Sequence, residues 1–74
     1  MNYWSIVKTT LQYIEEHLKD DISLEALSGN AGYSEFHFCR VFKRETGMPV
    51  MDYVRKRRLV HALADMEKGK NMLG

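Results

Sequence analysis

The chain begins with an amphipathic pattern of apolar residues at intervals of three and four positions. These residues are Trp4, Val7, Leu11, Ile14 and Leu18. Such spacing places them on one side of a helix and predicts that this side packs into a core. Asn2 is suited to cap the start of the helix, and the polar residues 19–21 end it.

A second, shorter helix is predicted after Ser23, which can cap it. Its apolar residues are Leu24, Ala26 and Leu27. Residues 28–30 (Ser-Gly-Asn) mark its end, and Gly32 can adopt the positive φ that a tight reversal requires. A short helix, a turn containing glycine and a further helix form the pattern of a helix-turn-helix.

The third helix is predicted between Ser34, a suitable N-cap, and Gly47, a suitable stop. One side, within an arc of roughly 100°, is apolar and predicted to be core. It carries Phe38, Val41 and Phe42. The opposite arc carries an aromatic ring, a thiol and two cations, from Phe36, Cys39, Arg40 and Lys43. That side would suit an anionic, grooved partner, and duplex DNA is the first candidate.

A fourth helix is predicted from Val50 to about Glu67. Its apolar or small residues partly follow helical spacing: Val50, Tyr53, Val54, Leu59, Ala62, Leu63 and Met66. The four cations at 55–58 circle this helix, so at least one must lie close to the body. We hypothesise that Arg57 or Arg58 pairs with Glu45, which falls on the apolar side of the third helix.

Charge is distributed unevenly along the chain, although the net charge is only +1. Residues 1–39 hold two lysines and six acidic residues (−4). Residues 40–58 hold seven cations and two acidic residues (+5), and residues 59–74 balance to zero. A solvated helical surface accounts for the charge alone equally well, whereas charge and helix faces together favour a phosphate-facing side.

Length and composition indicate one small domain. The 74 residues are 45% hydrophobic, which suffices for a single small core. The chain has one cysteine, which excludes an internal disulfide and points to a reducing cytosol. No apolar run approaches the roughly 20 residues that span a bilayer, and no signal-peptide pattern opens the chain. We therefore expect a cytoplasmic protein, associated with the nucleoid if it binds DNA.

Candidate catalytic and metal-binding residues do not form a site. The residues to consider are His17, His37, His61 and Cys39. They lack the spacing of a zinc site, and His37 and Cys39 diverge by about 160° on a helix. Glu15 and Glu16 are adjacent and point in different directions, so they do not form a carboxylate pair. We expect neither an enzyme nor a cofactor, and the main alternative to DNA binding is a helix-turn-helix module that binds another protein.

Residues 13–62, about two thirds of the chain, resemble the DNA-binding domain of the AraC/XylS family of bacterial transcription factors. The most specific parts are ISLEAL, AGYS, the run F-x-R-x-F-K-x-E-T-G that ends at Gly47, and YVRKRRL. The resemblance implies an all-α, homeodomain-like bundle of about four helices. In the family, two helix-turn-helix units are joined by a linker helix, and each places a recognition helix in the major groove. Here the first unit and the linker helix are expected.

The resemblance also implies roles for residues of the recognition helix, 35–46. Base edges would be read by Phe36, Cys39 and Arg40. The DNA backbone would be contacted by Ser34, His37, Lys43 and Arg44. Three departures from the family pattern are Ser28, where alanine is usual, Pro49, where a capping Ser or Thr is usual, and Cys39, where a longer polar side chain is usual. Ser28 suggests a loose second helix, and Pro49 suggests a shifted start of the linker helix. Cys39 suggests contact with a thymine methyl in place of a hydrogen bond.

The expected domain division follows from the same resemblance. Residues 1–68 would form the helix-turn-helix subdomain with its linker helix, and 69–74 a flexible tail or the start of a second unit. No effector domain is expected before this unit, and no small-molecule site is evident. The expected partners are double-stranded DNA and, as a second candidate, RNA polymerase, with no membrane.

Overall fold

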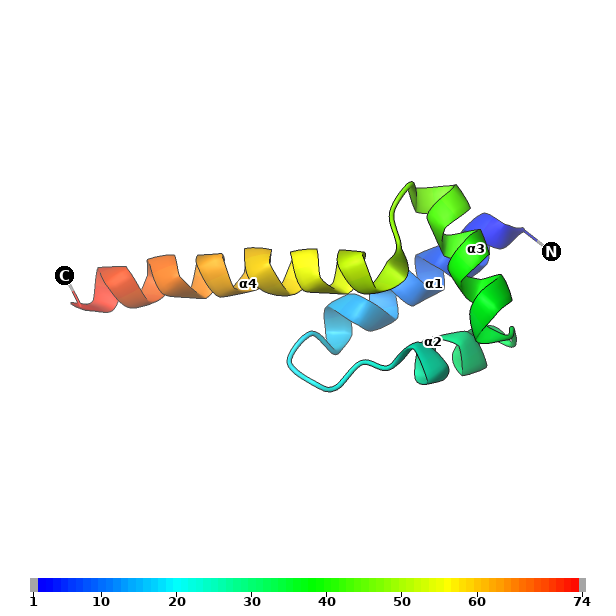
Figure 1. Cartoon of the computed structure of the whole chain (residues 1–74). Coiled ribbons are helices and arrows are strands. Elements are labelled where there is room, and N and C mark those ends of the chain that lie inside the picture. Colours follow the sequence, from blue (N-terminus) through cyan, green and yellow to red (C-terminus); the bar gives the residue numbers. More distant parts are fainter. Residues whose placement is uncertain (1, 74) are drawn as a thin grey trace.

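The computed structural model describes the backbone of residues 2–73 and the side chains of residues 2–66. The described residues form four helices: α1 (Tyr3–Glu16), α2 (Leu24–Ala31), α3 (Glu35–Thr46) and α4 (Val50–Leu73). The first three form a body at one end of the molecule, and α4 projects from it (Figure 1). The molecule is therefore elongated, with extents of 50 × 21 × 17 Å. The expected all-α fold with a helix-turn-helix is confirmed.

The helix starts are set by side chains that bind free backbone N–H groups. Asn2 accepts from the N–H of Trp4 at 2.9 Å, and Ser23 from that of Ala26 at 3.1 Å. Ser34 accepts from the N–H of His37 at 3.2 Å. Each bond satisfies a donor that has no partner within its helix, so the three predicted caps are confirmed.

Two glycines end the helices on either side of the turn. Gly32 (φ 79°) follows α2 and Gly47 (φ 82°) follows α3, both in the left-handed region. A residue with a Cβ adopts this conformation only at a cost, so glycine is the natural choice at both places. The predicted bounds of α3 are confirmed.

The core lies where α3 packs on α1 and α2. Its buried residues are Val7, Ile14, Leu18, Ile22, Leu27, Phe38, Val41, Phe42, Val50 and Val54. Phe38 and Phe42 are among the largest fully buried side chains, and their ring centroids lie 6.2 Å apart. Burying such rings removes a large apolar area from water, which is the main stabilising contribution in a domain of this size.

Trp4 does not join the core, contrary to the prediction, and is 45% exposed. The buried side of α1 is centred on Val7, Thr10 and Ile14. At 100° per residue, Trp4 lies roughly 90° from the centre of that arc and so falls at its edge. Thr10 is tolerated in the core because its hydroxyl donates to the carbonyl of Ile6 at 2.9 Å.

Helix α2 is regular over eight residues, although its sequence departs from the family pattern at Ser28. This serine is 4% exposed, and its hydroxyl donates to the carbonyl of Glu25 at 3.2 Å. The bond satisfies a polar group that would otherwise be costly to bury.

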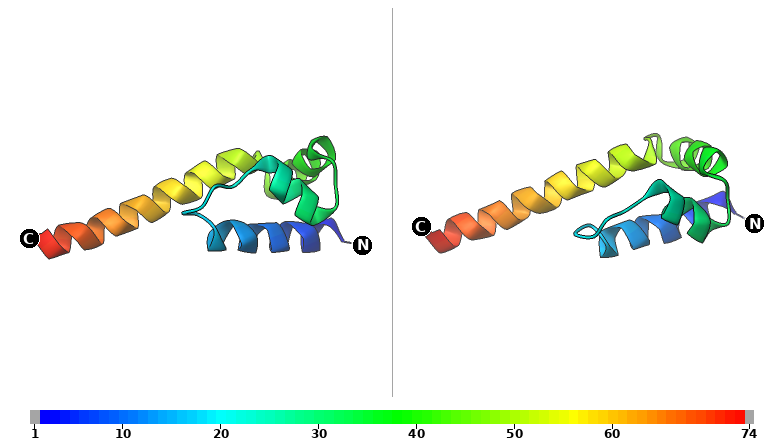
Figure 2. Two further views of the ribbon diagram at one scale, coloured as in Figure 1. Left: turned by 90° about the horizontal axis from the view of Figure 1, so that it is seen from below. Right: turned by 60° about the horizontal axis from the view of Figure 1, so that its bottom comes forward.

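Two arginines of α4 bind groups in the last turn of α1 and in the turn that follows it. Arg57 donates from Nε and Nη2 to the two carboxylate oxygens of Glu15, at 2.9 and 2.8 Å. Arg58 donates to the backbone carbonyls of Leu18 at 3.0 Å and Asp20 at 2.7 Å. Figure 2 shows the corresponding arrangement, in which α4 runs in the same general direction as α1 and extends beyond it.

The predicted pairing of Glu45 with Arg57 or Arg58 is therefore wrong. Glu45 lies in the last turn of α3, close to where α4 begins, whereas Arg57 and Arg58 lie two turns along α4. The nearest cation to Glu45 is its neighbour Arg44, with Nε 3.8 Å from Oε2.

Helix α4 extends to Leu73, beyond the predicted end near Glu67. Its first turns bury Val50 and Val54. Its later apolar side chains are exposed: Leu59, Val60, Leu63 and Met66. The division into 1–68 and 69–74 stays a prediction. Within the described residues, no helix combines the length and apolar character needed to cross a membrane.

Candidate nucleic-acid interface

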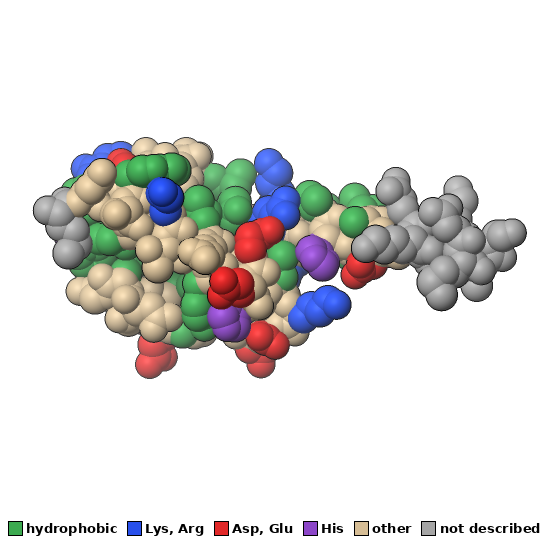
Figure 3. Space-filling model, turned by 180° about the vertical axis from the view of Figure 1, so that it is seen from behind, with side chains coloured by type: hydrophobic (Ala, Val, Ile, Leu, Met, Phe, Trp, Pro, Cys, Tyr) green, Lys and Arg blue, Asp and Glu red, His purple; other side chains and the backbone are tan. Residues whose placement is uncertain are grey.

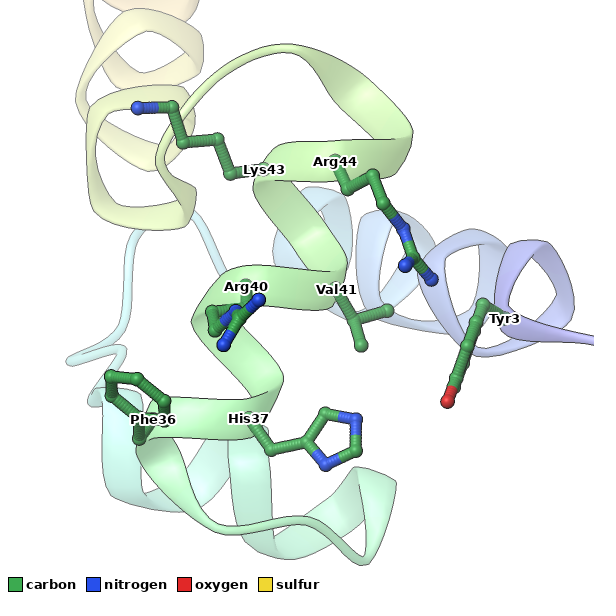
Figure 4. Close-up of a pocket in the computed structure, with 7 residues that line it drawn as sticks. All are labelled: Tyr3, Phe36, His37, Arg40, Val41, Lys43 and Arg44. Carbon is green, nitrogen blue, oxygen red and sulfur yellow. The ribbon is translucent and has the colours of Figure 1, made fainter.

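The outer face of α3 is open to solvent. Phe38, Val41 and Phe42 point into the body and are at most 4% exposed. On the opposite side, Phe36 is 73% exposed, and Arg40 and Lys43 are exposed beside it (Figure 4). We call these last three residues the outer face. The predicted orientation of α3 is confirmed, because α1 and α2 cover only its apolar side.

Arg40 lies near the middle of the outer face. Its guanidinium carbon is 5.7 Å from the centroid of the Phe36 ring, one turn earlier in the helix. Such a cation–π contact is worth about 0.5–1 kcal/mol at an exposed site and favours one position of the arginine. Among the described side chains, no carboxylate lies within ion-pair distance of Arg40. Its hydrogen-bond donors are therefore available to a partner.

Cys39 lies at the edge of the outer face. It is half-buried and packs against the core cluster. On a helical projection Cys39 is only about 60° from Phe42, which is fully buried. Its thiol is therefore less accessible than the sequence pattern suggested, and its role in base reading stays a prediction.

An aromatic cluster adjoins the outer face. The rings of Tyr33 and His37 stack with centroids 4.6 Å apart and planes 4° from parallel. Tyr3, from the first turn of α1, meets both rings edge-on at 6.3 and 6.2 Å. The guanidinium carbon of Arg44 lies 5.1 Å from the centroid of the Tyr3 ring.

Sequence reasoning missed Tyr3 and Tyr33. Tyr33 directly precedes the Ser34 cap, so its position beside α3 was a local signal that could have been used. Tyr3 is 41 positions from Arg44 in the chain, and no spacing rule connects the two. Only the packing of α1 against α3 brings them together.

A depression lies between α3 and the first turn of α1 (Figure 4). It is lined by Tyr3, Phe36, His37, Arg40, Val41, Lys43 and Arg44. The lining thus contains three permanent cations and no carboxylate. Four of the predicted site residues with polar side chains meet here: His37, Arg40, Lys43 and Arg44. The fifth, Ser34, lies at the start of the helix and caps it.

Of the four cations at residues 55–58, three bind groups within the protein, and Arg58 binds the backbone carbonyls of Leu18 and Asp20. Arg55 pairs with Asp52, and Arg57 with Glu15. The hydrogen bond from Arg57 lowers the pKa of Glu15 below its ordinary value, and the same bond raises the pKa of Arg57. Acidic side chains gather on the face shown in Figure 3, around the place where the body meets α4. Lysine and arginine side chains lie beside them on the same face.

A helix-turn-helix whose second helix exposes several cations, with Arg40 among them outside ion-pair distance of any described carboxylate, is typical of the class of DNA-binding regulators. The chain is a member of the AraC family of bacterial regulatory helix-turn-helix proteins, whose family pattern matches residues 14–55.

Individual relatives support the same assignment. The chain is 44% identical over 64 residues to the uncharacterized HTH-type transcriptional regulator YbfP of Bacillus subtilis, covering 86% of this chain and 22% of YbfP. It is 35% identical over 63 residues to the HTH-type transcriptional activator AarP of Providencia stuartii, covering 85% and 47%. It is 40% identical over 53 residues to the multiple antibiotic resistance protein MarA of Escherichia coli, covering 72% and 42%.

The chain spans less than half the length of these three relatives. No solved structure gives a significant match to it.

Proposed function

We propose that this chain binds double-stranded DNA by placing α3, residues 35–46, in the major groove, as part of a transcriptional regulator. The observation that carries the proposal is the orientation of α3. Its aromatic and aliphatic side is buried, which leaves Arg40 exposed, and among the described side chains Arg40 has no carboxylate partner. The major groove of B-DNA, about 12 Å wide, accepts an α-helix presented in this way.

Arg40 is the proposed base-reading residue. Its planar guanidinium can donate two parallel hydrogen bonds to O6 and N7 of guanine, worth ~1–3 kcal/mol of discrimination. Phe36 and Cys39 are proposed to contact thymine methyl groups or sugars. Phe36 exposes an apolar ring to water in the free protein, and contact with DNA would cover it.

Residues around Arg40 are proposed to contact phosphates. Lys43 and Arg44 supply positive charge near the last turn of α3, and His37 and Ser34 lie near its start. Ser34 accepts a hydrogen bond from the N–H of His37 and keeps its own hydroxyl proton for a phosphate oxygen. Such contacts contribute affinity and salt dependence but carry no sequence information.

The two kinds of contact are distinguished by alanine variants. Arg40→Ala should flatten the preference at one base pair, whereas Lys43→Ala should weaken binding to all sequences alike and reduce the salt slope by about 1. Binding is measured with labelled duplexes of varied sequence at two salt concentrations. Lys19→Ala, which removes an exposed cation in the turn after α1, is the matched control and should leave binding nearly unchanged.

Because one recognition helix makes few contacts, the 74-residue chain should bind weakly and mostly nonspecifically, with strong salt dependence and a sequence preference limited to the few base pairs that α3 contacts. Tight binding that is insensitive to salt would contradict this assignment. Equal effects of Arg40→Ala and Lys43→Ala at every sequence would show that the two roles are wrongly assigned.

The cellular setting follows from the same proposal. A DNA-binding regulator would act in the bacterial cytoplasm, at the nucleoid, and RNA polymerase stays a proposed second partner. We propose no enzymatic activity. Residues 1–68 are proposed as the functional unit.

A further inference from the structure

Arg44 is placed differently from the other two cations of the depression. In Figure 4 the side chain of Lys43 points toward α4, whereas that of Arg44 points the opposite way, toward the first turn of α1. Arg40 lies between them. The cations of α3 therefore point to different sides of the helix. Phosphates on both sides of a groove could each be contacted by one of these cations.

Two groups lie beside the guanidinium of Arg44. Nε lies 3.8 Å from the Oε2 atom of Glu45, a long contact for an ion pair, and the guanidinium carbon lies 5.1 Å from the centroid of the Tyr3 ring. The arginine side chain is 64% exposed. Without the ring, the neighbouring carboxylate would be the main attraction, and it would partly neutralise the charge that a phosphate requires.

Tyr3 is itself held in position. Its ring meets His37 and Tyr33 edge-on, and those two rings are stacked on each other. The three rings come from α1, from α3 and from the turn before α3. The Tyr3 side chain has only two torsions, and two other rings already restrict them. It therefore loses little further conformational freedom when it orients an arginine.

We propose that Tyr3 is a positioning residue for DNA binding, which holds Arg44 toward the depression for a backbone phosphate. The phosphate would lie on the side of α3 that faces α1, across the helix from the phosphate reached by Lys43. The inference rests on the proposed function. It assigns a role to a residue that precedes the segment matched by the family.

The test is a double-mutant cycle on the whole chain. Tyr3→Leu removes the ring, Tyr3→Phe keeps it without the hydroxyl, and both are also made in the Arg44→Ala background. Affinity for a short labelled duplex is measured at two salt concentrations, and the thermal midpoint checks the fold. Tyr3 is 37% exposed and outside the buried core, so the variants should remain folded. If Tyr3→Leu lowers the midpoint, Tyr3→Met replaces it.

Tyr3→Leu should weaken binding about two- to fivefold, the effect of losing one exposed cation–π contact. Tyr3→Phe should bind as the unaltered chain does, because the contact needs the ring alone. In the Arg44→Ala background Tyr3→Leu should have no further effect, because the ring acts through the guanidinium.

Three results would overturn the inference. Equal losses with Tyr3→Leu and Tyr3→Phe would show that the hydroxyl contacts DNA directly. Additive losses in the cycle would show that Tyr3 and Arg44 act separately. An unchanged affinity with Tyr3→Leu, while Lys43→Ala weakens binding, would remove Tyr3 from the site and leave the proposed function intact. If the unaltered chain binds no duplex at low salt, the proposed function itself fails.

Discussion

Gly47 determines where α3 ends and where the chain turns toward α4. Its φ of 82° lies in the left-handed region, and its N–H donates to the carbonyl of Lys43 at 2.7 Å. A Cβ built at this position would meet no atom within 4 Å. The need for glycine is therefore conformational and does not come from crowding.

Gly47→Ala should destabilise the fold by about 1–2 kcal/mol, the cost of a left-handed conformation for a residue with a Cβ. Gly29→Ala is the matched control, because Gly29 lies within α2 and also has open space around its Cβ position. Alanine there should stabilise the fold by about 0.5–1 kcal/mol. Urea unfolding of both variants measures the two effects, and changes of the same sign would contradict this assignment.

Features set by neighbouring residues were predictable from the sequence. The caps at Asn2, Ser23 and Ser34 and the stop at Gly47 each depend on a few adjacent positions. The faces of α3 followed from helical spacing alone. The contact of Tyr3 with Arg44 was not predictable, because it depends on how two helices pack.

At the level of helices, the contact between α1 and α4 orients the projecting helix. Arg57 binds both carboxylate oxygens of Glu15, and Arg58 donates to two carbonyls just beyond α1. Both carbonyls lie in the turn that follows α1, and Arg58 satisfies them as hydrogen-bond acceptors. Two of the seven cations in residues 40–58 therefore hold α4 against the body.

Glu15→Gln should remove a pH-dependent contribution to stability. The bond from Arg57 lowers the pKa of Glu15 from its ordinary value of 4.5. Because this folded-state pKa is depressed, the carboxylate stabilises the fold above pH 4.5, and the contribution is lost as the pH falls through the lowered pKa. The unaltered chain should therefore be more stable than Glu15→Gln at neutral pH, and the difference should disappear in acid.

Glu16→Gln is the control for this comparison. Glu16 is the adjacent carboxylate, and its described contact is a long hydrogen bond from Gln12 at 3.5 Å. Thermal unfolding across a pH series should show no comparable difference for this variant. A Glu15→Gln midpoint equal to that of the unaltered chain at neutral pH would show that the ion pair contributes nothing.

The pairing of α4 with the body could be predicted only in part. Four consecutive cations around one helix required that at least one lie against the body, and Arg57 and Arg58 do so. The partner could not be identified, because the direction in which α4 leaves α3 is not encoded in local spacing. That direction brings residues 57 and 58 to the end of α1 and away from Glu45.

For the molecule as a whole, the packing of α1 and α2 determines which side of α3 stays open. These two helices cover the apolar side of α3, while α3 presents cations on the side that remains open. Residues 15–25, in α1, α2 and the loop between them, hold five of the ten acidic residues. Helical spacing predicted the open face of α3, and the family resemblance implied the fold. Neither predicted the exposed apolar residues of α4, because a periodic pattern does not show which part of a long helix has a partner.

The most direct test is a titration of the ¹⁵N-labelled chain with a short DNA duplex at low salt, followed by heteronuclear NMR. DNA bound to the outer face of α3 should shift the amide signals of Phe36, Arg40 and Lys43, while Lys19 and the exposed residues 59–66 of α4 should change little. Absence of shifts at saturating duplex, or shifts confined to a second depression between α1 and α2, which is lined by residues such as Thr9, Leu27 and Asn30, would contradict the proposal that α3 binds DNA.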